Sequence, residues 1–181
     1  HDEIRFWADY IDPASSGYVY DDDEWVEAGF RAPIQPQGGL APGALFVILG
    51  DQNADPDDGD ATFNPANLLL GSPRVDTSLT PQSAGALEQV PGSFTNRQSK
   101  TASFNLRADY ALPVADPLLN LDDAWVFWPE TTDLEAGLLA ASDHRMVVVD
   151  LDAVPEPGIA TGLLVGSFAL AWARRRSDRR D

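Results

Sequence analysis

The segment at residues 44–53 constrains the fold of this chain more than any other. It begins with six apolar residues in succession and ends in Gly50-Asp51-Gln52-Asn53. An unbroken apolar run is typical of a strand that is covered on both faces. We therefore predict a buried strand that presents Asp51 and Asn53 at its carboxyl end, on a rigid base suited to reactive groups. The alternative is an ordinary core strand that ends in an Asx-rich turn.

The charge of the chain is acidic and uneven. Its 181 residues carry a net charge of −17; residues 153–181 carry +2, so residues 1–152 carry −19. Affinity for the nucleic-acid backbone comes mainly from Lys and Arg, so the acidic charge of residues 1–152 disfavours tight duplex binding unless cations intervene. Such a charge suits an exported protein or one that works with divalent metal ions. The absence of cysteine excludes disulfides, Cys-based zinc sites and a thiol nucleophile.

Two helices are predicted on either side of the central segment. Residues 2–12 place apolar side chains on one helical face: Ile4, Trp7, Tyr10 and Ile11. A short helix is predicted through residue 70, with Asn64 as its N-cap and Pro65 at its first position.

The acidic stretches and the long polar segment are predicted to be loops. Residues 21–24 and 54–60 are rich in carboxylates but lack the spacing of an EF-hand, so solvated turns are expected. The first of these could also form the first turn of a short helix. Residues 71–103 are predicted to be a long excursion that borders a substrate, with a short strand at 93–96.

Three further strands are predicted, at residues 105–113, 122–128 and 143–152. In the first, alternation places Asp109 on the opposite face from Tyr110. The second is rich in aromatic and branched residues, as strands prefer. The third contains an apolar run at 146–149, predicted to be a second covered strand, and is preceded by Ser142-Asp143-His144.

Polar motifs therefore stand at or near the ends of three predicted strands: Gly-Asp-Gln-Asn at 50–53, Arg-Ala-Asp-Tyr at 107–110 and Ser-Asp-His-Arg at 142–145. In this order they resemble the G-D-x-N, R-x-D-Y and S-D-H signatures of the endonuclease/exonuclease/phosphatase superfamily. The resemblance covers roughly residues 46–151. It implies that residues 1–152 have an α+β fold, the C-terminal half of a four-layer α/β/β/α sandwich. The implied activity is metal-dependent hydrolysis of phosphodiesters or phosphomonoesters.

The resemblance also implies a role for each matched residue. His144 would be the general base that takes a proton from water, and Asp109 would hold its other ring nitrogen. Asp51 would orient the water or protonate the leaving oxygen, and Asn53 would donate to a phosphate oxygen of the substrate. Asp143 would bind a divalent metal ion, expected to be Mg²⁺, with Ca²⁺ or Mn²⁺ as alternatives. The alternative for His144 is a structural histidine within a strand.

The first half of the superfamily domain has no counterpart in this chain. That half supplies an Asn, a metal-binding Glu and a second His, and none of its motifs precedes His1. We therefore expect this chain alone to be inactive or only marginally folded, with one sheet uncovered and apolar surface exposed. A different class of function is also open, in which a surface-anchored protein keeps the fold without catalysis.

Residues 153–181 differ from the rest of the chain. They contain Pro155-Glu156-Pro157, sixteen uncharged residues at 158–173 and an arginine cluster at 174–176. A sixteen-residue helix is about 24 Å long, slightly short of a hydrocarbon core of about 30 Å. The arrangement resembles a PEP-CTERM sorting signal with a single membrane helix, with an ordinary tail anchor or a buried core helix as alternatives. It implies processing by an exosortase-type enzyme and export in a Gram-negative bacterium. The arginines would stay on the cytoplasmic side of the inner membrane, with the body on the periplasmic side or at the cell surface.

Overall fold

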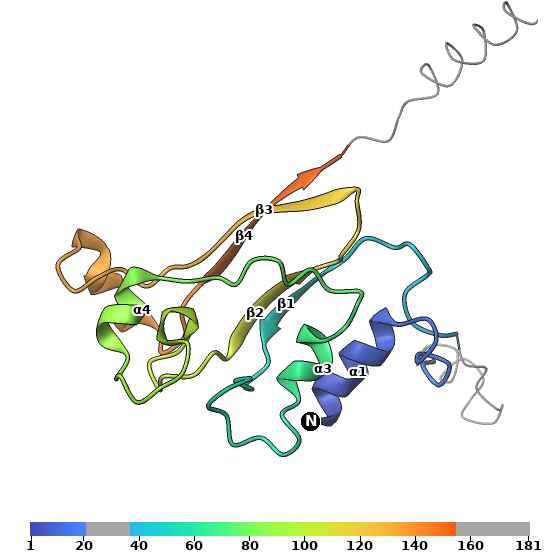
Figure 1. Ribbon diagram of the computed structural model, residues 1–181, viewed down its shortest axis with the longest axis horizontal. Coiled ribbons are helices and arrows are strands. Elements are labelled where there is room, and N and C mark those ends of the chain that lie inside the picture. Colours follow the sequence, from blue (N-terminus) through green and yellow to red (C-terminus); the bar gives the residue numbers. More distant parts are fainter. Residues whose placement is uncertain (21–36, 155–181) are drawn as a thin grey trace, which may run out of the picture.

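The computed structural model describes residues 1–20 and 37–154. Their strands form two antiparallel pairs, β1 with β2 and β3 with β4 (Figure 1). The helices and strands, in chain order, are α1 (Asp2–Ile11), β1 (Val47–Asp51), α3 (Ala66–Leu70), α4 (Ala84–Gln89), the 3₁₀ helix η1 (Arg97–Ser99), β2 (Asp109–Pro113), β3 (Leu119–Val126), the 3₁₀ helix η2 (Leu134–Ala141) and β4 (Val147–Ala153). Helices combined with small antiparallel sheets confirm the α+β class.

One core forms where α1 and α3 pack together against β1 and β2 (Figure 1). The amphipathic pattern predicted this correctly for Ile4 and Ile11 of α1, which are buried, whereas Trp7, predicted on the same face, is exposed. Ile48 of β1 and two side chains of β2, Tyr110 and Leu112, face the same cluster. Burial of an isoleucine or leucine side chain contributes about 1.5–3 kcal/mol, so this cluster holds the β1–β2 pair in place.

A second core lies at the β3–β4 end of the molecule. Ala86 and Val90, in α4 and just after it, pack with Val126 and Trp128. The close approach depends on Gly85, because a Cβ at that position would lie 2.1 Å from the carbonyl oxygen of Trp128. Ser83 caps α4 with its side chain, which accepts hydrogen bonds from Gly85 and Ala86.

The prediction that residues 44–49 are covered on both faces is wrong. Ile48 is buried, whereas Leu49 is 70% exposed and Leu45 is also exposed. Within the described residues β1 pairs only with β2, and the first core covers the face that carries Ile48. The run at 146–149 is likewise not a covered strand, since Met146 precedes β4 and is 61% exposed, and the three valines that follow it are only half-buried. An unbroken apolar run has no period that separates one-sided from two-sided cover.

Several predicted boundaries also differ from the structure. Residues 93–96 form turns instead of a strand, and α3 begins at Ala66 with Pro65 as its cap residue. Asn64 does not cap this helix, because its backbone has φ 47° and its side-chain amide donates to the carbonyl oxygen of Pro56. The acidic stretch at 54–60 is not simply solvated, because Asp55 is buried.

Two predicted segments fall outside the described residues. They are the acidic run at 21–24 and the tail at 155–181, including the expected membrane helix at 158–173. Among residues 1–20 and 37–154, no helix is long and apolar enough to cross a membrane.

Candidate functional site

Asp51 and Asp109 meet because they are paired across two strands. Asp51 is the last residue of β1 and Asp109 is the first residue of β2, and the antiparallel register places them opposite each other. The hydrogen bond from the N–H of Gln52 to the carbonyl of Ala108, 2.8 Å long, extends the ladder past this pair. Backbone hydrogen bonds before and after this pair therefore fix the positions of the two residues that carry the carboxylates.

His144 reaches these carboxylates through a short bridge between segments that are distant in sequence. It lies just before β4 and pairs with Ala102 in an antiparallel bridge. Two backbone hydrogen bonds of 2.7 Å close this bridge, from Ser103 to Asp143 and from Arg145 to Thr101. Residues 101–103 thus dock the histidine segment beside the start of β2.

The three side chains form an ordered group. Nδ1 of His144 lies 3.0 Å from both carboxylate oxygens of Asp109, and its Nε2 lies 3.9 Å from Oδ2 of Asp51. A carboxylate only accepts hydrogen bonds, so Nδ1 carries the proton and the neutral ring presents a lone pair at Nε2. The imidazole is 30% exposed, and the ring of Phe104 meets it edge to face at 5.5 Å.

The surroundings of His144 favour its protonated form. The hydrogen bond with Asp109 raises the pKa of His144 above its ordinary value of 6.5. The charges of Asp109, Asp51 and Asp143 add to this rise in pKa, and partial burial opposes it. An imidazole with a raised pKa is a stronger base than free histidine, which suits proton abstraction near neutral pH.

Asn53 orients Asp51 in this structure. Its backbone N–H donates to Oδ1 of Asp51 at 2.8 Å, and its side-chain amide donates to Oδ2 at 2.7 Å. Asn53 has φ 46°, a left-handed conformation that Asn tolerates better than most residues. The Asx-rich turn considered from the sequence is therefore present, and it fixes the carboxylate at the strand end.

Asp51, Asp109 and His144 could hold a metal ion, because one ligand atom from each lies within 4.8 Å of the others. A metal ion would fit best at Asp51 and Nε2 of His144, because Nδ1 of His144 and the Asp109 carboxylate are hydrogen-bonded to each other. A carboxylate that holds the second nitrogen of a metal-binding histidine is a common arrangement in proteins. The exposed Asp143, predicted as the metal ligand, is not part of this group.

A buried ion cluster beside the site was not predicted from the sequence. Lys100, the only lysine of the chain, is completely buried, and its Nζ lies 2.7 Å from Asp55 and 2.6 Å from Asp58. Asp55 also accepts the backbone N–H of Arg107 at 2.6 Å. A single lysine within a strongly acidic chain was the one sequence signal for such a cluster.

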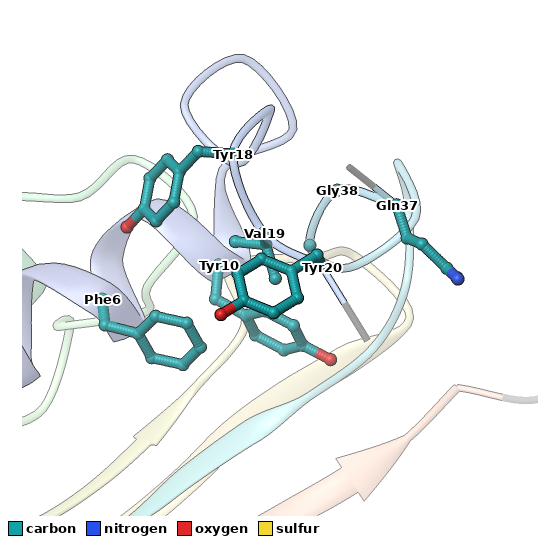
Figure 2. A pocket seen from close by; sticks show the side chains of 8 residues that line it. Phe6, Tyr10, Tyr18, Val19, Tyr20, Gln37 and Gly38 are labelled. Atoms are coloured by element: carbon teal, nitrogen blue, oxygen red, sulfur yellow. The ribbon is translucent and has the colours of Figure 1, made fainter. Parts of the chain in front are cut away.

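Two hollows lie along α1. One, of about 520 Å³, is lined by Asp51, Gln52 and Asn53 together with the start of α1, so it opens beside the candidate site. The other, of about 730 Å³, is lined by Phe6, three tyrosines and neighbouring residues, as Figure 2 shows. Its described lining residues carry neither a carboxylate nor an imidazole, and its ionisable groups are the phenols of the three tyrosines.

Comparison with known proteins gives no family for this chain. None of the protein-family models, curated proteins and solved structures compared with the chain matches it. The chemical assignment therefore depends on the geometry of Asp51, Asp109 and His144 and on the three sequence motifs that carry them.

Proposed function

We propose that this chain carries the proton-transfer part of a metal-dependent phosphoesterase site, within one half of a four-layer sandwich. The observation that carries the proposal is the hydrogen bond of 3.0 Å from Nδ1 of His144 to Asp109, with Nε2 directed toward Asp51 at the exposed edge of the site. A histidine held in this tautomer is a ready general base for water.

The residues of the chain would divide the work as follows. Nε2 of His144 takes the proton of the attacking water, while Asp109 holds the ring and stabilises the imidazolium that forms. Asp51, held by the backbone N–H of Asn53, orients that water, and the leaving oxygen takes a proton from solvent. When substrate enters, the Asn53 amide would turn from Asp51 to donate to a phosphate oxygen. Asp143 lies next to His144 and adds negative charge at the same edge.

A bound divalent ion would neutralise charge on the transferring phosphoryl group and polarise it. Nε2 of His144 cannot bind a metal ion and accept a proton at the same time. Mg²⁺ prefers oxygen ligands, so it would be held by a carboxylate and would leave Nε2 free. Asp51 is the proposed ligand, because Asp143 lies outside the group of three side chains. Ca²⁺ and Mn²⁺ share this preference for oxygen and are the alternatives.

The proposal also includes the class of substrate and the location of the protein. The charge of −19 on residues 1–152 favours small phosphoesters over tightly bound duplex nucleic acid. The Pro-Glu-Pro motif with its apolar run and arginines favours export and sorting at the inner membrane by an exosortase-type enzyme.

The test is a hydrolysis assay on the protein, purified both as this chain and at the full length that its gene encodes. The substrates are bis-p-nitrophenyl phosphate, p-nitrophenyl phosphate and plasmid DNA, each with and without Mg²⁺. We expect Mg²⁺-dependent hydrolysis that falls by about 10²- to 10⁴-fold in H144N, while the matched control H1N keeps its activity. Equal activity in H144N would refute the role of His144. Absence of hydrolysis in both forms would favour a non-catalytic, surface-anchored protein.

A further inference from the structure

Thr101 lies where the two parts of the candidate site join. Its side chain is buried, and its hydroxyl donates to Oδ2 of Asp109 at 2.9 Å. The hydroxyl oxygen of Thr101 also accepts hydrogen bonds from the backbone N–H groups of Ala108 and Asp109, each at 2.9 Å. With two donors aimed at it, the hydroxyl oxygen is held in place and its proton points toward the Asp109 carboxylate.

The backbone of Thr101 contacts the histidine segment as well. Its carbonyl accepts the N–H of Arg145 at 2.7 Å, and the next residue, Ala102, bridges to His144. One residue therefore touches Asp109 through its side chain and the neighbour of His144 through its main chain. Asp109 begins β2 of one sheet and His144 precedes β4 of the other, so their relative position depends on the contacts that join these two segments.

We propose that Thr101 is a positioning residue that fixes the Asp109 carboxylate toward Nδ1 of His144 and so selects the tautomer with a free lone pair at Nε2. The inference rests on the proposed function for its catalytic consequence, although the tautomer itself is a property of the chain alone. Oδ2 of Asp109 accepts from both Thr101 and His144, so removal of the hydroxyl frees the carboxylate to rotate away from the ring. Without that acceptor, Nδ1 has no fixed partner and the second tautomer, protonated at Nε2, gains population.

The test uses the metal-free chain labelled with ¹⁵N-histidine, which contains only His1 and His144. Long-range ¹H–¹⁵N correlation at a pH where both rings are neutral reports which nitrogen carries the proton. We expect the Nδ1–H form of His144 to predominate in the wild type and in T101S, which keeps the hydroxyl. In T101V we expect the two forms to mix. The matched control is S99A, which deletes another buried hydroxyl nearby that donates to the carbonyl of Asn96 and not to Asp109.

Activity supplies the second readout. Loss of an outer partner of a reacting group typically lowers activity by about 10- to 100-fold, so kcat should fall by that factor in T101V with KM unchanged. T101S and S99A should stay within about twofold of the wild type on the same scale. A tautomer change in T101V without any hydrolysis by the wild type would refute the proposed function and leave the positioning role standing. Wild-type hydrolysis with T101V unchanged in tautomer and kcat would refute the positioning role alone.

One further measurement tests the proposal on the wild type alone, in case the T101V variant fails to fold. The buried hydroxyl proton of Thr101 in the wild type should exchange slowly and show a nuclear Overhauser effect to the Nδ1 proton of His144. A rapidly exchanging hydroxyl proton would overturn the proposal without any variant.

Discussion

Replacing Lys100 with methionine should destabilise the protein strongly and in a pH-dependent way. The side chain of Lys100 is 1% exposed and lies between the carboxylates of Asp55 and Asp58. Methionine preserves much of the apolar stem but leaves two acids without their cation. Removal of one partner from a buried ion pair costs about 3–5 kcal/mol. Because Asp58 retains partial contact with solvent, we expect a loss in the free energy of unfolding near the lower figure, about 3 kcal/mol.

The pH dependence follows from the two carboxyl groups. Burial acts to raise the pKa of Asp55, but the N–H of Arg107, the Lys100 ammonium and the nearby backbone donors outweigh it and hold the pKa below 3.8. The pKa of Asp58 is lowered in the same way, with Lys100 and Thr95 acting against desolvation. A lowered folded-state pKa gives stability that is present above 3.8 and lost as the pH falls through the folded value. In K100M burial is no longer opposed by a cation, so the deficit of the variant should shrink as the pH approaches 3.8.

The assay is urea unfolding followed by tryptophan fluorescence at pH 7.5 and pH 4.5. With a slope of about 1–3 kcal/mol per molar, the expected loss moves the urea midpoint by roughly 1–3 M at the higher pH. The control R5M removes a cation from the exposed pair with Asp2 and should change stability by less than about 1 kcal/mol. A K100M shift no larger than that of R5M, or one that is equal at both pH values, would refute the argument from buried charge.

Three further predictions concern the site and the core. First, kcat/KM should rise with pH and level off with a midpoint above 6.5, because the base must be neutral and Asp109 raises the pKa of His144; a pH–rate profile with a midpoint at or below 6.5 would contradict this. Second, Mg²⁺ should support hydrolysis and excess Zn²⁺ should inhibit it, because Zn²⁺ accepts the imidazole Nε2 that must take the proton; activation by Zn²⁺ in the same assay would instead make His144 a metal ligand. Third, L112A should lower the free energy of unfolding by about 2–5 kcal/mol, whereas L49A at an exposed position should change it by about 0.5 kcal/mol or less, as measured by urea unfolding; similar losses in both would contradict the one-sided cover of β1.

The convergence of Asp51, Asp109 and His144 could be predicted because each residue is tied to a strand end. Asp51 ends β1, Asp109 begins β2 and His144 precedes β4. That these three positions meet was expected from the order of the three motifs, which resembles that of the superfamily. The helix at residues 2–12 could be predicted for a similar reason, since its apolar positions repeat with the helical period. Local patterns of this kind need no knowledge of distant contacts.

Thr101 and Lys100 could not be predicted in this way. Both lie in the polar excursion at 71–103, and no sequence pattern indicates the residues that they contact. Asp55, for example, is 45 residues from Lys100 along the chain. Their side chains look like those of solvated loop residues until the backbone brings the acids to them. The exposed face of β1 was missed for a different reason, because an apolar side chain such as Leu49 does not itself indicate whether another layer covers it.

The burial of Lys100 also makes that residue a reporter of local opening. An amine-directed reagent can modify the side chain only while the cluster around it is open, since the ammonium has no contact with solvent when the cluster is closed. When closing is fast compared with modification, the rate of acylation measures the equilibrium population of the open form. Mass spectrometry of the single modified lysine would thus measure how often the segment that carries Lys100 and Thr101 opens.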